Sequence, residues 1–221
     1  MSDDGLQLRI GEEKDTPFLA KTVREAEASG GPRSTYGVLF ELPPQRVEEK
    51  LRDLIEEDIE GCELGFSNFV VVTDRDGAPV GACAGWIEGT GNQASGFLRG
   101  QMLSYGFGPE RWKDAQDGLR ALSQVHPQRM PGALQMESFY VDPVVRGRGL
   151  VGRMIEKHFE RFAGQFDIAE IQMANHNRAA RRSYEKAGFK MTNELISDAP
   201  LLRAILGTNG MLLMQWRKGG H

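Results

Sequence analysis

Hydrophobic and polar positions along the chain change their period several times, and each change marks a predicted element. A short alternation at residues 6–10 predicts a strand. Apolar positions at helical spacing over 18–26 predict a helix that stops at Ser29, and a second helical stripe follows over 47–59. The chain therefore opens with one strand and two helices.

The middle of the chain combines a predicted hairpin with a glycine-rich segment. Apolar runs at 69–72 and 80–87 flank the turn sequence DRDG, so they predict two antiparallel strands joined by a tight turn. Residues 89–132 then change character, because they begin GTGNQASG and include a predicted helix near 110–124. We interpret residues 89–132 as an insertion.

After the insertion, strands and helices alternate. The pattern predicts a strand at 133–141, a helix at 149–163, a strand at 168–173, a helix at 177–187 and a final strand at 211–216. A β-α-β-α order favours parallel neighbouring strands joined by a right-handed crossover. No linker-like stretch divides the chain, so we predict a single mixed α/β domain over residues 1–221.

Composition excludes several classes of protein. The 221 residues carry 27 Lys and Arg against 31 Asp and Glu, a formal charge of −4, so nothing draws the whole chain to nucleic acid or to an anionic membrane. No run approaches the roughly 18 apolar residues of a membrane span, and the first residues lack the order of a signal peptide. Cys62 and Cys83 stand alone, which predicts neither a disulfide framework nor a metal site. We expect a cytoplasmic protein that uses no metal, membrane or nucleic acid.

The segment FYVDPVVRGRGLVGRMIEKHF, residues 139–159, joins a strand to a helix through a glycine-rich loop. An apolar stripe docks the helix, so its N-terminal amides face the loop. Free amides at the positive end of a helix dipole form an anion site, and Gly147 and Gly149 let a phosphate approach the backbone. Positive charge is added by Arg146, Arg148 and Arg153.

Two well-known phosphate-binding motifs fit this loop less well. No GK[ST] sequence is present, which excludes the phosphate loop of an NTPase. The pattern over 147–152 does match the dinucleotide fingerprint GxGxxG, but residues 142–145 separate it from the strand, and Gln172 and Met173 stand where a ribose-binding acid belongs. A dinucleotide-dependent oxidoreductase is the weaker alternative. A further alternative is a loop that binds no ligand, but the positive charge of its three arginines at a helix N-terminus would then lack a balancing anion.

Two motifs resemble the GNAT family of acyl-coenzyme A acyltransferases. Arg146-x-x-Gly149 is similar to the start of the family's Arg/Gln-x-x-Gly-x-Gly/Ala pyrophosphate segment, although Val151 takes the place of the second Gly or Ala and Gly152 follows it. The sequence NRAARRSYEKAGF at 177–189 closely resembles the family's Asn-x-x-Ala-x-x-x-Tyr-Glu-Lys-x-Gly-Phe element. The order of predicted elements is also similar to the family's, except in residues 89–132.

The resemblance implies a fold, a cosubstrate and a set of contacts. The fold is a mixed, largely antiparallel sheet flanked by helices, with a central parallel pair of strands, 133–141 and 167–173, that splay apart. Acetyl-CoA would lie in this gap and supply an acetyl group to a primary amine of a small molecule or peptide, by direct attack. The residues implied in coenzyme binding are Phe139, Tyr140, Val141, Arg146, Gly147, Arg148, Gly149, Leu150, Val151, Gly152, Asn177, Ala180 and Tyr184.

Acetyl transfer needs a proton acceptor for the amine, donors for the oxyanion and a proton for the departing thiolate. By resemblance, Tyr184 is the acid and a backbone amide within 139–141 polarises the thioester carbonyl. Glu137 has the strand parity of positions 139 and 141, so we predict that it faces the cleft and accepts a proton directly or through water. Gln135 and Gln172 occupy places where some family members keep a catalytic Glu, which leaves a non-catalytic coenzyme sensor as an alternative.

The predicted insertion is the candidate acceptor site, because members of a shared fold differ where the second substrate enters. Its glycines permit mobility, and its aromatic side chains are candidate pocket residues, namely Phe97, Tyr105, Phe107 and Trp112. A surface excursion or a homodimer contact is the alternative. His126 ends the insertion and is a further candidate for the acceptor pocket, whereas His158 lies on a buried helix stripe and packs in the core. The acceptor itself is not named by the sequence.

Overall fold

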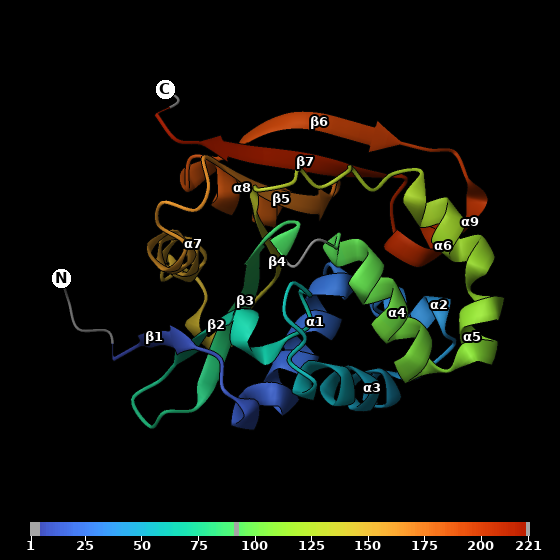
Figure 1. Ribbon diagram of the computed structural model, residues 1–221, viewed down its shortest axis with the longest axis horizontal. Helices are drawn as coiled ribbons and strands as arrows, with labels where there is room; N and C mark the ends of the chain where they lie inside the picture. The colour runs from blue at the N-terminus through green and yellow to red at the C-terminus, as the bar shows by residue number, and fades with distance from the viewer. Residues whose placement is uncertain (1–4, 91–92, 220–221) are drawn as a thin grey trace.

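The structure, a computed structural model, describes residues 5–90 and 93–219 (Figure 1). These residues form a seven-stranded sheet in the order β1-β2-β3-β4-β5-β7-β6. Neighbouring strands are antiparallel except for β4 and β5, which are parallel. The predicted mixed α/β fold, with a largely antiparallel sheet and a central parallel pair, is confirmed.

The strands come from both halves of the chain. They are β1 (Gln7–Ile10), β2 (Phe69–Thr73), β3 (Pro79–Ile87), β4 (Leu134–Val141), β5 (Ile168–Ala174), β6 (Lys190–Ile196) and β7 (Gly210–Arg217). The predicted hairpin is confirmed, because β2 and β3 pair with Val70 opposite Cys83. The edge strand β6 was not predicted. It is exposed along most of its length, so it carries no apolar alternation.

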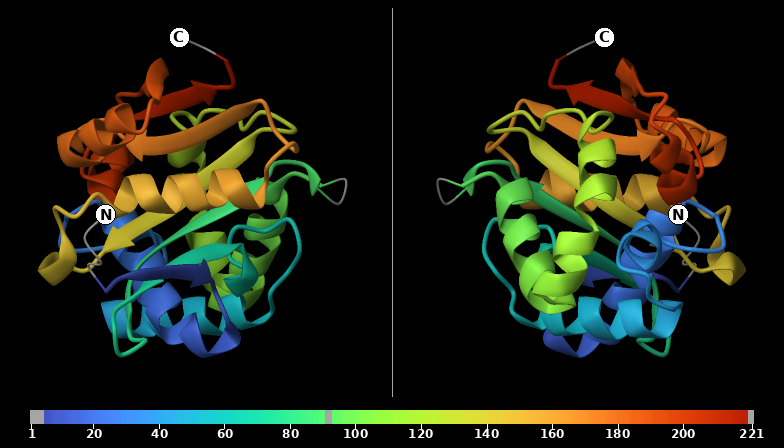
Figure 2. Two further views of the ribbon diagram at one scale, coloured as in Figure 1. Left: turned by 90° about the vertical axis from the view of Figure 1, so that its left-hand side faces the viewer. Right: turned by 90° about the vertical axis from the view of Figure 1, so that its right-hand side faces the viewer.

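Helices cover both faces of the sheet. They are α1 (Thr16–Ala28), α2 (Thr35–Leu39), α3 (Pro44–Glu56), α4 (Ser95–Phe107), α5 (Pro109–Asp114), α6 (Gln116–Ser123), α7 (Leu150–Arg161), α8 (Arg178–Lys186) and α9 (Pro200–Leu206). Figure 2 shows α7 across one face, with α1, α3 and the helices α4 to α6 on the other. No helix in the described part of the chain is long and apolar enough to cross a membrane.

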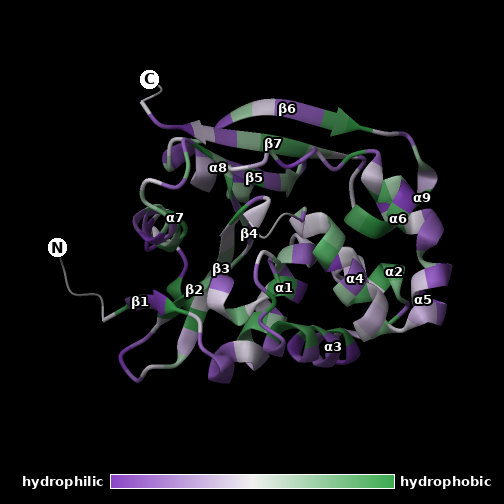
Figure 3. Cartoon of the chain, in the orientation of Figure 1, coloured by the Kyte–Doolittle hydropathy of each residue, from purple (hydrophilic) through white to green (hydrophobic). Residues whose placement is uncertain are grey.

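Helix α3 illustrates how the apolar stripes build the core. Its positions Val47, Leu51, Leu54 and Ile55 are buried against α1 and the sheet, while its other face is charged (Figure 3). Full burial of each such side chain contributes roughly 1.5–3 kcal/mol relative to exposure. Pro44 occupies the first turn, where its missing amide hydrogen costs no helical bond.

Residues 95–107 of the predicted insertion form helix α4, and the single helix predicted near 110–124 is two short helices, α5 and α6. Phe107 of α4 stacks on Phe40 with ring centroids 4.1 Å apart, inside the main core. A Cβ atom at Gly106 would lie 2.7 Å from Leu54. This glycine therefore permits close packing of α4 on α3, rather than the mobility predicted from the sequence. Residues 91–92 of the segment lie outside the described residues.

Candidate active site

The site lies where the central parallel strands separate. β4 and β5 pair only at Leu134 with Ala169 and at Gln135 with Glu170, and beyond this point they splay apart. A cavity of about 860 Å³ occupies the gap, lined by both strands, the starts of α7 and α8, and the end of α1. The splayed pair implied by the resemblance is therefore present, and the backbone of β4 beyond Gln135 is not paired with β5.

A bulge at Ser138 redirects the side chains of β4. Ser138 has φ +56°, and only Cys83 separates the β3 partners of Glu137 and Tyr140. The extra residue breaks the alternation. Phe139 packs toward α7, whereas the ring of Tyr140 meets α1, with its centroid 6.0 Å from that of Phe18. The predicted common parity of positions 137, 139 and 141 is therefore wrong, although Glu137 still lines the cavity.

The 146–152 loop delivers the N-terminus of α7 to the other end of the cavity. Gly147 and Gly149 have φ of +81° and +71°, a left-handed conformation that favours glycine. An added Cβ atom at either glycine, or at Gly152, would meet no atom within 4 Å. The first amides of α7 have no partner within the helix and face this open space. The loop can therefore hold an anion such as a pyrophosphate.

The three arginines of this segment take different positions. Arg146 lines the cavity and donates from Nε to the Val141 carbonyl at 3.0 Å. Arg148 is exposed and does not line the cavity. Arg153 turns away and donates to the Leu6 carbonyl at 2.9 Å. The positive charge predicted at the loop therefore comes from Arg146 and the helix terminus, with Arg148 nearby.

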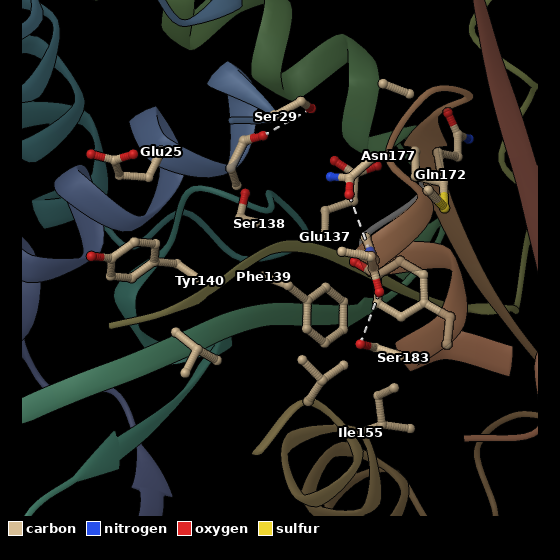
Figure 4. A pocket seen from close by; sticks show the side chains of 18 of the residues that line it. Glu25, Ser29, Glu137, Ser138, Phe139, Tyr140, Ile155, Gln172, Asn177 and Ser183 are labelled. Atoms are coloured by element: carbon tan, nitrogen blue, oxygen red, sulfur yellow. Dashed lines mark hydrogen bonds between the residues drawn. The ribbon is translucent and has the colours of Figure 1, made fainter. Parts of the chain in front are cut away.

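Helix α8 brings Tyr184 into the gap. Asn177 caps α8, because its Oδ1 accepts from the Ala180 amide at 3.1 Å (Figure 4). Tyr184 is only 6% exposed, and its ring lies 5.1 Å from that of Phe139. Burial raises the pKa of its phenol above the ordinary value, so the hydroxyl is protonated at neutral pH but is a weaker acid than an exposed tyrosine.

Glu137 belongs to a buried network of charges. Arg129 donates to its Oε1 at 2.6 Å, and Arg99 lies 3.8 Å from Oε2. Both arginines also pair with Glu63, at 3.2 and 2.9 Å. The two guanidinium groups hold the pKa of Glu137 below its ordinary value despite burial. Its carboxylate is therefore ionised, fixed in place and weakly basic.

Neutral polar groups surround this network. Burial lowers the pKa of His126, which also lines the cavity, to about 4, so its imidazole is uncharged at pH 7. Gln172 lines the cavity and donates to the Pro127 carbonyl at 2.9 Å.

His158 is fully buried, with Nε2 3.1 Å from the Cys83 carbonyl, as predicted for a core histidine. Burial likewise raises the pKa of both cysteine thiols, which leaves them protonated.

The structure also places residues in the cavity that carry no sequence motif. The carboxyl end of α1 contributes Glu25, Glu27 and Ser29, and the following α2 contributes Thr35. We define the polar end of the cavity as Glu27, Thr35, Arg99, His126, Glu137 and Gln172. Of the predicted insertion, Arg99 and His126 reach it. The four predicted aromatic residues do not, because Phe97 and Tyr105 are exposed and Phe107 and Trp112 pack in the core.

The fold is similar to solved acetyltransferase structures. A GCN5-related N-acetyltransferase from Kribbella flavida shares 15% identity over 98% of this chain and 99% of that chain, with a TM-score of 0.57. YncA from Salmonella typhimurium, solved with its cofactor acetyl-CoA, shares 12% identity over 99% and 96% (TM-score 0.51). RimL, a ribosomal L7/L12 alpha-N-protein acetyltransferase in complex with coenzyme A, shares 13% over 99% and 97% (TM-score 0.56). No curated protein matches the sequence significantly.

A family comparison covers the site itself. The model of the family described as Acetyltransferase (GNAT) family matches residues 35–189, which include the 146–152 loop and the motif at 177–189. The alternative of a dinucleotide-dependent oxidoreductase required a parallel, doubly wound sheet after the GxGxxG pattern. The observed sheet is antiparallel except at β4 and β5, so that alternative is wrong.

Proposed function

Because the chain belongs to the GNAT family of acetyltransferases, we propose that it transfers an acetyl group from acetyl-CoA to a primary amine by direct attack. The observation that carries the proposal is the splayed gap between β4 and β5. It joins an anion-binding helix terminus at one end to a protonated phenol and a polar end at the other. Similar folds hold acetyl-CoA or coenzyme A, which supports the same cosubstrate here.

The gap fits the three parts of the coenzyme. Amides of the 146–152 loop and Arg146 hold the pyrophosphate, since the loop offers open space, donors and positive charge. The backbone of β4 from Phe139 to Val141 pairs with β3 but is free on the side of β5, where it bonds the amide groups of the pantetheine arm. Asn177 and Ala180 form the opposite wall through α8. Arg148 assists from the surface by its charge.

Proton and charge transfer are then assigned to groups beside the bulge. Ser138 turns the chain so that backbone amides of the 139–141 stretch stabilise the oxyanion that develops on the thioester carbonyl. Tyr184 gives its proton to the thiolate as the carbon–sulfur bond breaks, and it regains one from water. Glu137 is ion-paired and weakly basic, so we assign it the orientation of water beside the amine and not the direct abstraction of its proton.

The acceptor enters at the polar end. This end lies beyond the bulge from the loop and is bounded by α1 and by Arg99 of α4. RimL is an acetyltransferase of a ribosomal protein, but at 13% identity this does not fix an acceptor for the present chain. A small-molecule or peptide amine remains the proposed class.

One experiment separates an enzyme from a coenzyme sensor. Calorimetric titration with acetyl-CoA, coenzyme A and NADH is followed by an assay of free thiol release in the presence of a panel of primary amines. We expect one equivalent of either coenzyme to bind, no NADH binding, and thiol release that requires an amine. Coenzyme binding without release for any amine would support a sensor, and no coenzyme binding would refute the proposed function.

A further inference from the structure

The carboxyl end of helix α1 forms one wall of the polar end. Ala26, Glu27 and Ser29 line the cavity there, and Figure 4 shows Ser29 on the side where Ser138 and Glu137 lie. The last carbonyls of a helix carry partial negative charge, which favours a cation. α1 has no basic residue in its last turn. The helix therefore adds negative potential to the polar end.

The polar end and its buried charge network contain one more carboxylate than guanidinium groups. Arg99 and Arg129 are balanced by Glu63 and Glu137 through the ion pairs described above. Glu25 pairs with Arg24 at 2.6 Å.

Within the described chain, Glu27 has no ion-pair partner. The charged groups that act on it are Arg99 from α4, Glu137 from β4 and Glu63 from the segment before β2. Burial raises the pKa of Glu27 above its ordinary value, in contrast to that of Glu137. The hydroxyl of Thr35, from α2, donates to the backbone oxygen of Glu27 at 3.3 Å. Glu27 is thus a half-buried carboxylate that feels the charge of Arg99 without forming an ion pair with it, and it lies in a cavity open to a ligand.

We propose that Glu27 receives the ammonium group of the acceptor and takes its proton, so that the acceptor is an aliphatic amine without a carboxylate of its own. This inference rests on the acetyl transfer proposed above. An acceptor carboxylate would meet Glu27 and the end of α1, and both nearby guanidinium groups are already paired with carboxylates. A cationic amine would instead neutralise the charge that the protein leaves unbalanced.

The proposed step balances protons. The ammonium gives one proton to the Glu27 carboxylate, and the neutral amine forms the new carbon–nitrogen bond at the thioester carbonyl. When the carbon–sulfur bond breaks, the thiolate takes a proton from Tyr184. The nitrogen releases its second proton to water, and water returns one to the Tyr184 phenolate. Glu27 then loses its proton to solvent, so each turnover releases one proton, as amide formation from an ammonium requires.

The experiment compares two acceptors of equal chain length, butylamine and 4-aminobutanoate. For the wild-type enzyme we expect kcat/KM for butylamine to exceed that for 4-aminobutanoate at least tenfold. Glu27→Gln should lower kcat/KM for butylamine by roughly a hundred- to ten-thousand-fold, the range for a lost proton-transfer group, with the coenzyme Kd unchanged. Glu49→Gln, a matched change on the outer face of α3, should leave both values as in the wild type.

A second readout does not depend on the acceptor. Since burial opposes the charged form of Glu27, Glu27→Gln should raise Tm at pH 7, and this gain should disappear at acidic pH where Glu27 is protonated. A Glu27 that only supports the structure would give a lower Tm instead.

The outcomes separate the two proposals. Failure to bind acetyl-CoA overturns the proposed function. If the coenzyme binds, any one of four results overturns the role of Glu27. These are a wild-type preference for 4-aminobutanoate, no turnover of either amine up to its solubility limit, an unaffected Glu27→Gln variant, and a lowered Tm for that variant.

Discussion

Gly152 is the position in the 146–152 loop where a substitution best tests coenzyme binding without disturbing the fold. It is the third residue of α7, it lines the cavity, and a Cβ atom there would meet no neighbour within 4 Å. Gly149 is less suitable, because its φ of +71° would strain any bulky replacement. A substitution at Gly152 therefore changes the space for the ligand without straining the backbone.

The Gly152→Glu variant should be more stable and bind coenzyme A less tightly. Replacing a helical glycine by a better helix former gains about 0.5–1 kcal/mol, and a carboxylate in the first turn gains about 0.3–1 kcal/mol from the helix dipole. For a chain of this size each kcal/mol raises Tm by roughly 2–4 °C. The same carboxylate would face the pyrophosphate, and like charges about 4 Å apart cost between about 1 and 4 kcal/mol, depending on solvation.

Calorimetric titration with coenzyme A and thermal unfolding of the same preparations test this prediction. We expect Kd to rise by roughly ten- to a thousandfold while Tm rises by a few degrees. Gly152→Gln is the matched control, because it has the same size without the charge. A stable Gly152→Glu variant that binds coenzyme A as tightly as the wild type would show that the pyrophosphate does not lie on this loop.

The remaining predictions concern the acid, the core and the charge network. Tyr184→Phe should keep the coenzyme Kd and lower kcat by roughly ten- to ten-thousand-fold, whereas unchanged turnover would leave Tyr184 a packing residue. Phe107→Ala should lower the free energy of unfolding, measured in denaturant, by about 3–5 kcal/mol, because it removes the ring that stacks on Phe40. A loss below about 1 kcal/mol would contradict the placement of Phe107 in the core. Glu137→Gln should lower the free energy of unfolding at pH 7 by about 3–5 kcal/mol, because the buried Arg129 loses a carboxylate partner. Since the folded-state pKa of Glu137 is lowered, its stabilisation is complete above the ordinary carboxyl pKa and is lost as pH falls through the folded value, so wild type and variant should converge in acid unfolding.

Most elements that carry the coenzyme site could be predicted from the sequence. The 139–159 segment joins period-two and helical patterns across glycines, and its physical consequence is an exposed helix terminus. The motif at 177–189 places Asn177 and Tyr184 on one helix, with the asparagine as its cap. Local patterns suffice here, because each part of this site is contiguous in the chain.

Elements that depend on distant partners could not be predicted. The glycines of α4 lower its intrinsic helix propensity, and the helix forms because Gly106 and Phe107 pack on α3 and Phe40. The bulge at Ser138 leaves no pattern in the sequence, yet it decides which side of β4 Glu137 faces.

Glu137 and His126 of the polar end were predicted from the sequence, whereas Glu27, Thr35 and Arg99 were missed for the same reason. Glu27 lies on a helix more than a hundred residues before Glu137, and only the fold brings both to one cavity. A search for polar residues at the ends of buried helix stripes would have proposed Glu27 as a candidate, without indicating its partners.

The structure of the protein in complex with acetyl-CoA tests the central claim most directly. We predict the pyrophosphate on the amides of the 146–152 loop, the pantetheine arm along β4 in the gap with β5, and the acetyl carbonyl beside the bulge at Ser138, within reach of the Tyr184 hydroxyl. Coenzyme bound outside this gap, or with its thioester directed away from Tyr184 and the polar end, would contradict the account.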